Sequence, residues 1–307
     1  MPDLLGAHRR YIHILIGMKW MDRQGNILPN DDSDSRSLRF LYRTAFGRAV
    51  LGILTRPFVS RAAGALMDSG VSRIFIGGFI RKNSIDTSAF EERSYRSFND
   101  YFTRRIKPGR RSVDMDASHL IAPCDSKLTV YPIEDDSTFE IKDTVYTLES
   151  LLRNKELAEE YRGGSLLIFR LTVDDYHRYC YIDSGVKSDN LHINGVYHTV
   201  NPIACERYPI YKENTREYCT IESEVFGKLL MMEVGATMVG RIVNHHAAGR
   251  VVRGEEKGMF EFGGSTIVAA VQKGRVTIDG DIIANTKNGF ETVVKFGEKI
   301  GEREVRQ

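Results

Sequence analysis

Apolar and polar positions follow a helical period in the first third of the chain. Between Leu38 and Thr55, apolar residues recur at helical spacing with arginines between them, and Arg56-Pro57 should end that helix. A second helix is predicted over Phe58–Met67, followed by an apolar, glycine-rich segment over Val71–Ile80. Residues 1–112 are therefore predicted to form a helical region.

The pattern changes after residue 112 to short β-branched or aromatic runs separated by Gly, Asp and Asn. This spacing predicts a compact, mainly antiparallel β domain that resembles a sandwich or a barrel. The expected strands are Lys127–Ile133, Ser165–Leu171, Val196–Val200, Leu229–Val234, Val239–Val243, Thr266–Val271 and Val293–Phe296, with one helix over Leu148–Tyr161. The predicted class is α+β, with a helical region (1–112) and a β-rich domain (113–307) that meet in the polar Arg104–Ser118 stretch.

Charge is nearly balanced overall but uneven along the chain. The 307 residues carry a formal net charge of +2. From Arg36 to Lys82, however, there are nine basic residues and one acidic residue, Asp68. A basic, apolar helix pair can lie at a bilayer interface. The same pattern also describes a helical hairpin packed on the protein's own core, with its arginines in solvent.

The chain lacks the sequence signatures of several functional classes. The four cysteines show no C-x-x-C spacing, so we expect a reducing compartment. Met1-Pro2-Asp3 does not begin a secretory signal, and no apolar run is long enough for a spanning helix. Metal-site, nucleotide-loop and RNA-binding motifs are lacking, so no metal and no nucleic-acid partner is expected.

One segment, Phe262–Val268, has unusual chemistry for a strand. Its Gly263-Gly264 pair interrupts a β-like run directly before the hydroxyl of Ser265. That hydroxyl could take the Gly264 acyl group from nitrogen, and elimination of the resulting ester would cut the chain and leave a pyruvoyl group. Taken alone, such a segment is more often a glycine bulge before a buried strand.

Other segments supply the side chains that activate a hydroxyl nucleophile. Asp125 follows Ala122-Pro123-Cys124 at the start of a predicted strand, and His177 comes just after an apolar strand. His198 precedes Thr199-Val200-Asn201-Pro202. Sequence spacing alone does not show whether these side chains meet Ser265.

In this order, the segments resemble the phosphatidylserine decarboxylase family. The resemblance runs from Phe98 to Val271 and covers Phe98–Arg104, Ala122–Asp125, Lys142–Leu152, Asp175–Arg178, Thr199–Pro202, Glu213–Arg216, Val234–Gly240, Glu256–Phe260 and Phe262–Val268. Each segment is modest alone, but so many in the same order are specific. The Gly-Gly-Ser-Thr run thereby becomes strong support for self-cleavage.

The resemblance implies cleavage between Gly264 and Ser265 into a β chain, 1–264, and an α chain, 265–307, which together form a heterodimer. Ser265 would be the nucleophile and would become the pyruvoyl group that forms a Schiff base with substrate. Asp125 would be the charge-relay carboxylate, and His177 would serve the relay and the later protonation. Many members carry a second histidine where this chain has Cys180. Cys180 and His198 are therefore reserve candidates.

The resemblance further implies decarboxylation of phosphatidylserine to phosphatidylethanolamine in phospholipid biosynthesis, without a metal. Peripheral attachment to the cytoplasmic side of the cell membrane, through residues 38–80, is expected. Two other hypotheses stay open: a Ser-His-Asp acyl hydrolase that does not cut itself, and a lipid-binding homologue inactivated at Cys180. The sequence leaves homo-oligomer formation and acyl-chain preference undetermined.

Overall fold

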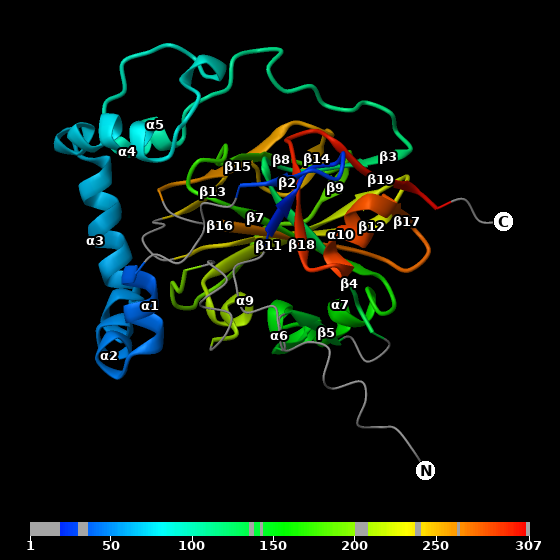
Figure 1. The fold of residues 1–307 in the computed structure, drawn as a ribbon. Helices are drawn as coiled ribbons and strands as arrows, with labels where there is room; N and C mark the ends of the chain where they lie inside the picture. The colour runs from blue at the N-terminus through cyan, green and yellow to red at the C-terminus, as the bar shows by residue number, and fades with distance from the viewer. Residues whose placement is uncertain are drawn as a thin grey trace.

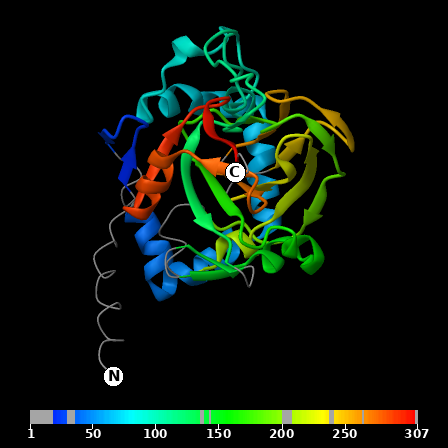
Figure 2. The ribbon, with the colours of Figure 1, turned by 90° about the vertical axis from the view of Figure 1, so that its right-hand side faces the viewer.

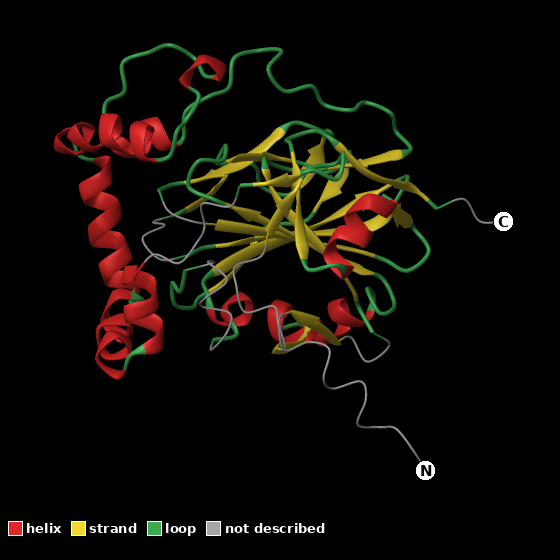
Figure 3. Cartoon of the chain, viewed as in Figure 1, coloured by secondary structure: helices red, strands yellow, loops and turns green. Residues whose placement is uncertain are grey.

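The computed structural model describes residues 19–29, 36–134, 138–141, 144–199, 208–236, 241–262 and 265–304. Helices dominate the part between 36 and 102, and antiparallel strands dominate from 119 onward (Figures 1 and 3). The predicted α+β class is therefore confirmed.

The first predicted helix is divided in two, α1 (Arg36–Arg43) and α2 (Ala45–Leu54). Between them Thr44 is extended, and its side chain accepts a hydrogen bond from Gly47 N, as an N-cap does. A Cβ at Gly47 would lie 2.0 Å from the Phe40 carbonyl oxygen, so only glycine allows this close turn. The predicted end at Arg56-Pro57 is confirmed, because α3 (Pro57–Asp68) begins there.

The helical region continues with η1 (Gly70–Phe75), α4 (Ile76–Lys82), η2 (Thr87–Ala89) and α5 (Phe98–Phe102). Helices α1–α3 form a column along one side of the sheets, and α4 and α5 lie at its far end (Figures 1 and 2). Ser97 caps α5 by accepting from Asp100 N. The cap fixes the start of α5, the helix that contacts Phe262 and His177.

One large sheet organises the β-rich part. Its strand order is β14 (Gly249–Val251), β9 (Gly185–Lys187), β11 (Arg216–Ser223), β12 (Gly227–Val234), β16 (Ser265–Val271), β7 (Ser165–Leu171), β4 (Ser126–Pro132), β18 (Phe290–Val294), β1 (Lys19–Met21) and β2 (Ile27–Leu28), with β10 (Leu191–Ile193) beside β11. The central strands are buried on both faces. All seven residues of β16 are buried, as its unbroken apolar run requires.

Smaller sheets cover one face of the large one. They are β13 (Ile242–Asn244), β15 (Glu256–Phe260) and β8 (Arg178–Cys180), and β17 (Val276–Ile278), β19 (Lys299–Arg303) and β3 (His119–Ile121). Side chains such as Phe169 and Ile267 from the large sheet pack against Tyr179 and Phe260 from the smaller one. We call this apolar layer between the sheets the interlayer core. The arrangement is sandwich-like, and the described strands form no closed barrel.

Helices cover the other face, with α6 (Leu148–Leu152), α7 (Lys155–Glu159) and α9 (Ile210–Glu213) packed on Leu166, Val268 and their neighbours. Beside α6 lie β5 (Thr138–Ile141) and β6 (Thr144–Thr147), and α10 (Gly280–Lys287) packs on β4 and β18.

Three sequence predictions need correction. Residues 19–28 form β1 and β2 rather than helix, because β1 pairs in parallel with β18 from the far end of the chain. The helix predicted over 148–161 breaks at Arg153, whose φ of 51° is left-handed. Val196–Tyr197 makes only an isolated bridge to Asn214 rather than a strand, and Val200 lies outside the described residues.

Candidate active site

Ser265 is the first residue of β16 and pairs with Leu171 at the end of β7. Because side chains alternate along a strand, Ser265 shares its face with Ile267, which belongs to the interlayer core. Ser265 is fully buried, and its Oγ has no hydrogen-bond partner among the described residues. Gly264, the predicted cleavage position, lies outside those residues with Gly263.

His177 lies just before β8 and continues its ladder, since Phe260 N donates to the His177 carbonyl. It therefore faces the same way as Tyr179, into the interlayer core that Ser265 also faces. Its Nδ1 lies 2.9 Å from the Asp175 carbonyl oxygen. A carbonyl only accepts, so Nδ1 carries the proton and Nε2 holds the lone pair. That Nε2 is buried and without a partner among the described residues.

Burial decides the protonation of His177. Removal from water lowers the pKa of His177 to about 3, and the buried Arg104 cation adds to the effect. The Phe102 ring covers the imidazole, with ring centroids 4.1 Å apart. In the uncleaved chain His177 therefore carries no charge at neutral pH. The imidazole is neutral there and is suited to accept a proton.

An ion pair between Lys127 and Asp175 fixes the loop that carries His177. Lys127 Nζ donates to Asp175 Oδ2 at 2.7 Å and to Thr172 Oγ1 at 2.6 Å. Asp175 Oδ2 also accepts from Thr172 N at 2.7 Å, directly after Leu171. The loop is thus tied to the end of β7 where Ser265 pairs. Nucleophile and imidazole therefore belong to one end of the sandwich.

Asp125 lies at the same end, two residues before Lys127, which pairs with Arg170 of β7. Its buried carboxylate accepts from Arg111 Nε and from Phe296 N, both at 2.9 Å. Burial alone would raise the pKa of Asp125, but Arg111 and these hydrogen bonds hold it below its usual value. The imidazole is oriented by a main-chain carbonyl instead. A charge-relay role for Asp125 stays a prediction.

The reserve candidates occupy other surroundings. His198 stacks on Tyr208 at 4.3 Å between ring centroids, and its Nδ1 lies 3.3 Å from the Tyr42 hydroxyl of α1. Burial lowers the pKa of His198 to about 4. The Cys180 thiol is fully buried, which raises its pKa far above the usual value. Neither side chain hydrogen-bonds to Ser265, whose Oγ has no partner among the described residues, so both reserve roles stay predictions.

Residues of the helical region to which the sequence analysis assigned no role contact the segment before Ser265. Asn99 of α5 accepts from Phe262 N at 3.0 Å through Oδ1, and its Nδ2 donates to Asp68 of α3 at 2.8 Å. The Phe262 ring packs edge-on against Phe98 and Phe102, at 4.7 and 5.3 Å between centroids. Helix α5 therefore holds the chain three residues before the nucleophile, and Phe102 also covers His177.

This geometry can perform one kind of chemistry. A buried hydroxyl and a neutral imidazole nitrogen, both lacking hydrogen-bond partners among the described residues, lie at the same end of the sandwich. Unsatisfied buried polar atoms cost about 1–3 kcal/mol each and are retained where function needs them. The pair is suited to the transfer of a proton from Ser265 to His177 and to attack by the freed oxygen.

Comparison with known proteins shows the family of the chain. Residues 98–302 match the family model described as phosphatidylserine decarboxylase. The chain is similar to phosphatidylserine decarboxylase proenzyme 2 of Clostridium acetobutylicum, with 46% identity over 86% of this chain and 91% of that one. It is also similar to the phosphatidylserine decarboxylase proenzymes of Ruminiclostridium cellulolyticum (43% identity, 87% and 91% covered) and Desulfitobacterium hafniense (38%, 89% and 93%).

Proposed function

Because the chain belongs to the phosphatidylserine decarboxylase family, we propose that it converts phosphatidylserine to phosphatidylethanolamine and carbon dioxide after cutting itself between Gly264 and Ser265. The observation that carries the proposal is the buried, unpartnered Ser265 hydroxyl, which faces the same interlayer space as the His177 imidazole. The relatives' designation as proenzymes supports the self-cleavage.

Self-cleavage needs only groups of this chain. His177 Nε2 takes the hydroxyl proton while Ser265 Oγ attacks the Gly264 carbonyl carbon, so that the acyl group moves from nitrogen to oxygen. Elimination across the Cα–Cβ bond of Ser265 then breaks the ester and releases the Gly264 carboxylate. Hydrolysis of the resulting dehydroalanine releases ammonia and leaves the pyruvoyl group. The β chain, 1–264, and the α chain, 265–307, stay associated because β16 is paired on both sides, with β7 and β12.

The surroundings of Ser265 fit such a group, because the residue is fully buried and its Cα becomes the ketone carbon, with the oxygen supplied by the water that releases ammonia. When formed, the pyruvoyl group supplies a carbonyl that draws electrons from the substrate as carbon dioxide leaves. His177 is the proposed proton carrier for the α-carbon. Asp125 is proposed as the negative charge that stabilises a protonated imidazole during both steps. For His177 to donate a proton, its pKa must rise after cleavage. We propose that this happens when substrate enters the site, because His177 is then no longer surrounded only by the buried groups that lower its pKa.

Peripheral membrane binding is proposed through α1–η1. Eight of the thirteen exposed large apolar side chains of the described residues lie between Phe40 and Phe75, and they include Phe46, Phe58, Val71 and Ile74. Basic residues accompany them, as interfacial helices require. None of the helices in the described ranges combines the length and hydropathy needed to cross a bilayer. Attachment at the cytoplasmic face is the arrangement that we infer.

The function is tested with phosphatidylserine vesicles and the natively purified protein, followed by lipid mass spectrometry. The proposal predicts phosphatidylethanolamine and carbon dioxide from the wild type and none from Ser265→Ala. An acyl hydrolase would instead release fatty acid from the lipid while its own chain stays intact. An inactive lipid-binding homologue would bind the vesicles and release nothing, and either result would overturn the proposal.

A further inference from the structure

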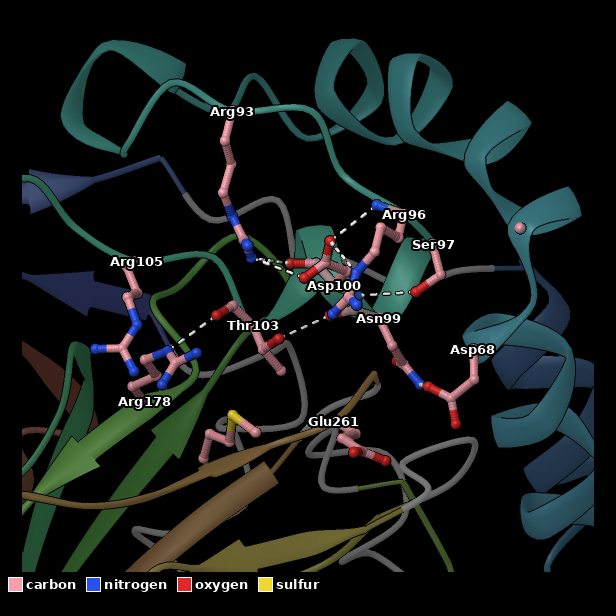
Figure 4. Close-up of a pocket in the computed structure, with 12 residues that line it drawn as sticks. Asp68, Arg93, Arg96, Ser97, Asn99, Asp100, Thr103, Arg105, Arg178 and Glu261 are labelled. Atoms are coloured by element: carbon pink, nitrogen blue, oxygen red, sulfur yellow. Dashed lines mark hydrogen bonds and ion pairs between the residues drawn. The ribbon is translucent and has the colours of Figure 1, made fainter.

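A polar crevice of about 640 Å³ lies where the helical region meets the small sheet (Figure 4). One wall comes from α3, η1 and α5, and the other comes from β8, β15 and the residue after β15. Four arginines line it: Arg93, Arg96, Arg105 and Arg178. Figure 4 shows Arg105 beside Arg178 on one side, with Arg93 and Arg96 along the rim.

Two of these arginines already have acceptors. Arg93 donates to Asp100 Oδ1 at 2.7 Å, and Arg178 donates to Glu256 Oε1 at 2.6 Å and to the Thr103 carbonyl at 2.9 Å. These bonds position the two guanidinium groups and leave part of each donor fork unused, because every guanidinium carries five N–H donors. Arg93 and Arg178 thus form a fixed frame.

The other two arginines are available to a ligand. Arg105 comes no closer than 3.8 Å to Glu256, and Arg96 no closer than 3.9 Å to Asp100, distances too long for a hydrogen bond. Their side chains are 56% and 91% exposed. Neither guanidinium donates to an acceptor among the described residues.

The acidic side chains in the crevice are occupied. Asp100 accepts from Arg93 and from Arg96 N, and Asp68 accepts from Asn99. Glu261 is paired with Arg241 at 2.7 Å, and burial raises its pKa. The group that the free guanidinium donors lack is therefore an external anion with several acceptor oxygens.

A lipid phosphate fits this position better than a free anion. Gly70 lines the crevice and begins η1, whose Val71 and Ile74 side chains are 68% and 73% exposed. A bilayer that receives these side chains would bring its phosphates next to η1, which borders the crevice at Gly70. Arginine forks match phosphate oxygens in pairs.

We propose that this arginine crevice binds the phosphodiester of a phospholipid headgroup, with Arg96 and Arg105 as the principal donors. The identification of the anion as a lipid phosphate rests on the proposed function at the membrane. The existence of an anion site rests only on the residues that line the crevice. Asn99 joins the site to the cleavage segment, because it lines the crevice and accepts from Phe262 N. A lipid held here would lie beside Asn99, which contacts the segment three residues before Ser265.

The test uses the full chain with Ser265→Ala, so that neither cleavage nor decarboxylation is needed for binding. Arg96→Gln and Arg105→Gln are combined on that background. The matched control combines Arg250→Gln and Arg303→Gln, two exposed positions of β14 and β19 that remove the same charge outside the crevice. Binding is measured to phosphatidylcholine vesicles containing phosphatidylglycerol, with soluble glycerophosphoserine and inorganic phosphate as competitors.

We expect the crevice variant to lose roughly thirtyfold in vesicle affinity and the control to lose only a few-fold. Glycerophosphoserine should compete with vesicles for the parent chain, and its binding should be absent in the crevice variant. Equal losses in both variants, or no loss in either, would overturn the proposal in favour of general electrostatics. A third result would also overturn the proposal: the crevice variant loses the binding of inorganic phosphate but keeps the binding of vesicles. The crevice would then be a site for a free anion.

Discussion

The helical region and the β-rich region differ in how far they bury their apolar side chains. In β16 every residue is buried, whereas α2, α3 and η1 leave Phe46, Phe58 and Ile74 at least 60% exposed. A monomeric protein rarely exposes so much apolar surface in one place unless a partner or a membrane covers it. The difference indicates that the strands fold around their own core and that the helices present a surface.

The boundary between the regions is nevertheless not a boundary of function. Helix α5 belongs to the helical region by sequence, yet Phe102 covers His177 and Asn99 holds Phe262. The helical region therefore has two parts. Its outer helices expose many apolar side chains and bury only a few, such as Tyr42 and Leu51, against the core, whereas its last helix contacts His177 and the segment before Ser265. Four predictions test this division, in order of expected effect.

The largest effect is expected from the β-rich region. His177→Gln removes the only proposed base, so self-cleavage should slow by roughly a thousandfold or more. The measurement is the fraction of uncleaved chain against time on a denaturing gel, with thermal unfolding to confirm the fold. His198→Gln and the exposed His192→Gln serve as controls. A His198→Gln variant that slows cleavage as strongly would contradict the assignment.

Asn99→Ala tests whether α5 belongs to the site. Loss of the hydrogen bond to Phe262 N lets the cleavage segment shift, and a misplacement of about 1 Å can cost a hundredfold in rate. Self-cleavage should therefore slow by about that factor. Asn154→Ala is the matched control, because it removes a helix cap of α7 far along the chain from the cleavage segment. Equal cleavage rates in both variants would reduce α5 to a structural role.

The outer helices should matter for membrane binding and little for stability. Phe46→Ser with Ile74→Ser removes two exposed apolar side chains, each of which contributes about 1.5 kcal/mol or more when fully buried. Vesicle affinity should fall by roughly tenfold or more, measured by flotation. The melting temperature should hardly change, since both side chains lie in solvent in the free protein. A large drop in melting temperature would mean that these helices pack on a core instead.

The smallest effect concerns pH. With its pKa lowered to about 3, His177 stays neutral, so its titration should leave the self-cleavage rate flat from pH 8 to pH 5. Phe102→Ala admits water and should move the pKa toward about 6.5, so that the rate falls up to tenfold per unit below that pH. In the wild type the folded pKa lies below the unfolded one. The contribution to stability is therefore complete above about pH 6.5 and is lost as pH falls toward 3. An inflection near pH 6.5 in the wild type, coinciding with His177 titration by NMR, would contradict the burial argument.

Much of the strand framework could be predicted from sequence, because its signal is local. The run Ser165–Leu171 matches β7, and Thr266–Val271 lies within β16, since fully buried strands are continuous in apolar residues. Features that depend on a side-chain cap or on a distant strand could not be predicted in this way. Thr44 interrupts a good helical period through a side-chain cap, and β1 exists only because β18 pairs with it from 271 residues away.

The site could be predicted only in part for the same reason. Ser265, His177 and Asp125 belong to recognisable segments, and the structure places all three at one end of the sandwich. The partner of Asp125, however, is Arg111, and that of Phe262 is Asn99, 163 residues earlier. Contacts of this kind leave no periodic trace. The burial that lowers the pKa of His177 likewise depends on Phe102, which no local pattern connects to it.

The most direct test of the account is the mass of the natively purified chain after denaturation. The account predicts two polypeptides, 1–264 and 265–307, the smaller with a pyruvoyl group in place of Ser265 and therefore closed to sequencing from its amino end. Ser265→Ala should give one intact chain. A wild-type protein that remains uncut and still produces phosphatidylethanolamine from phosphatidylserine would contradict it.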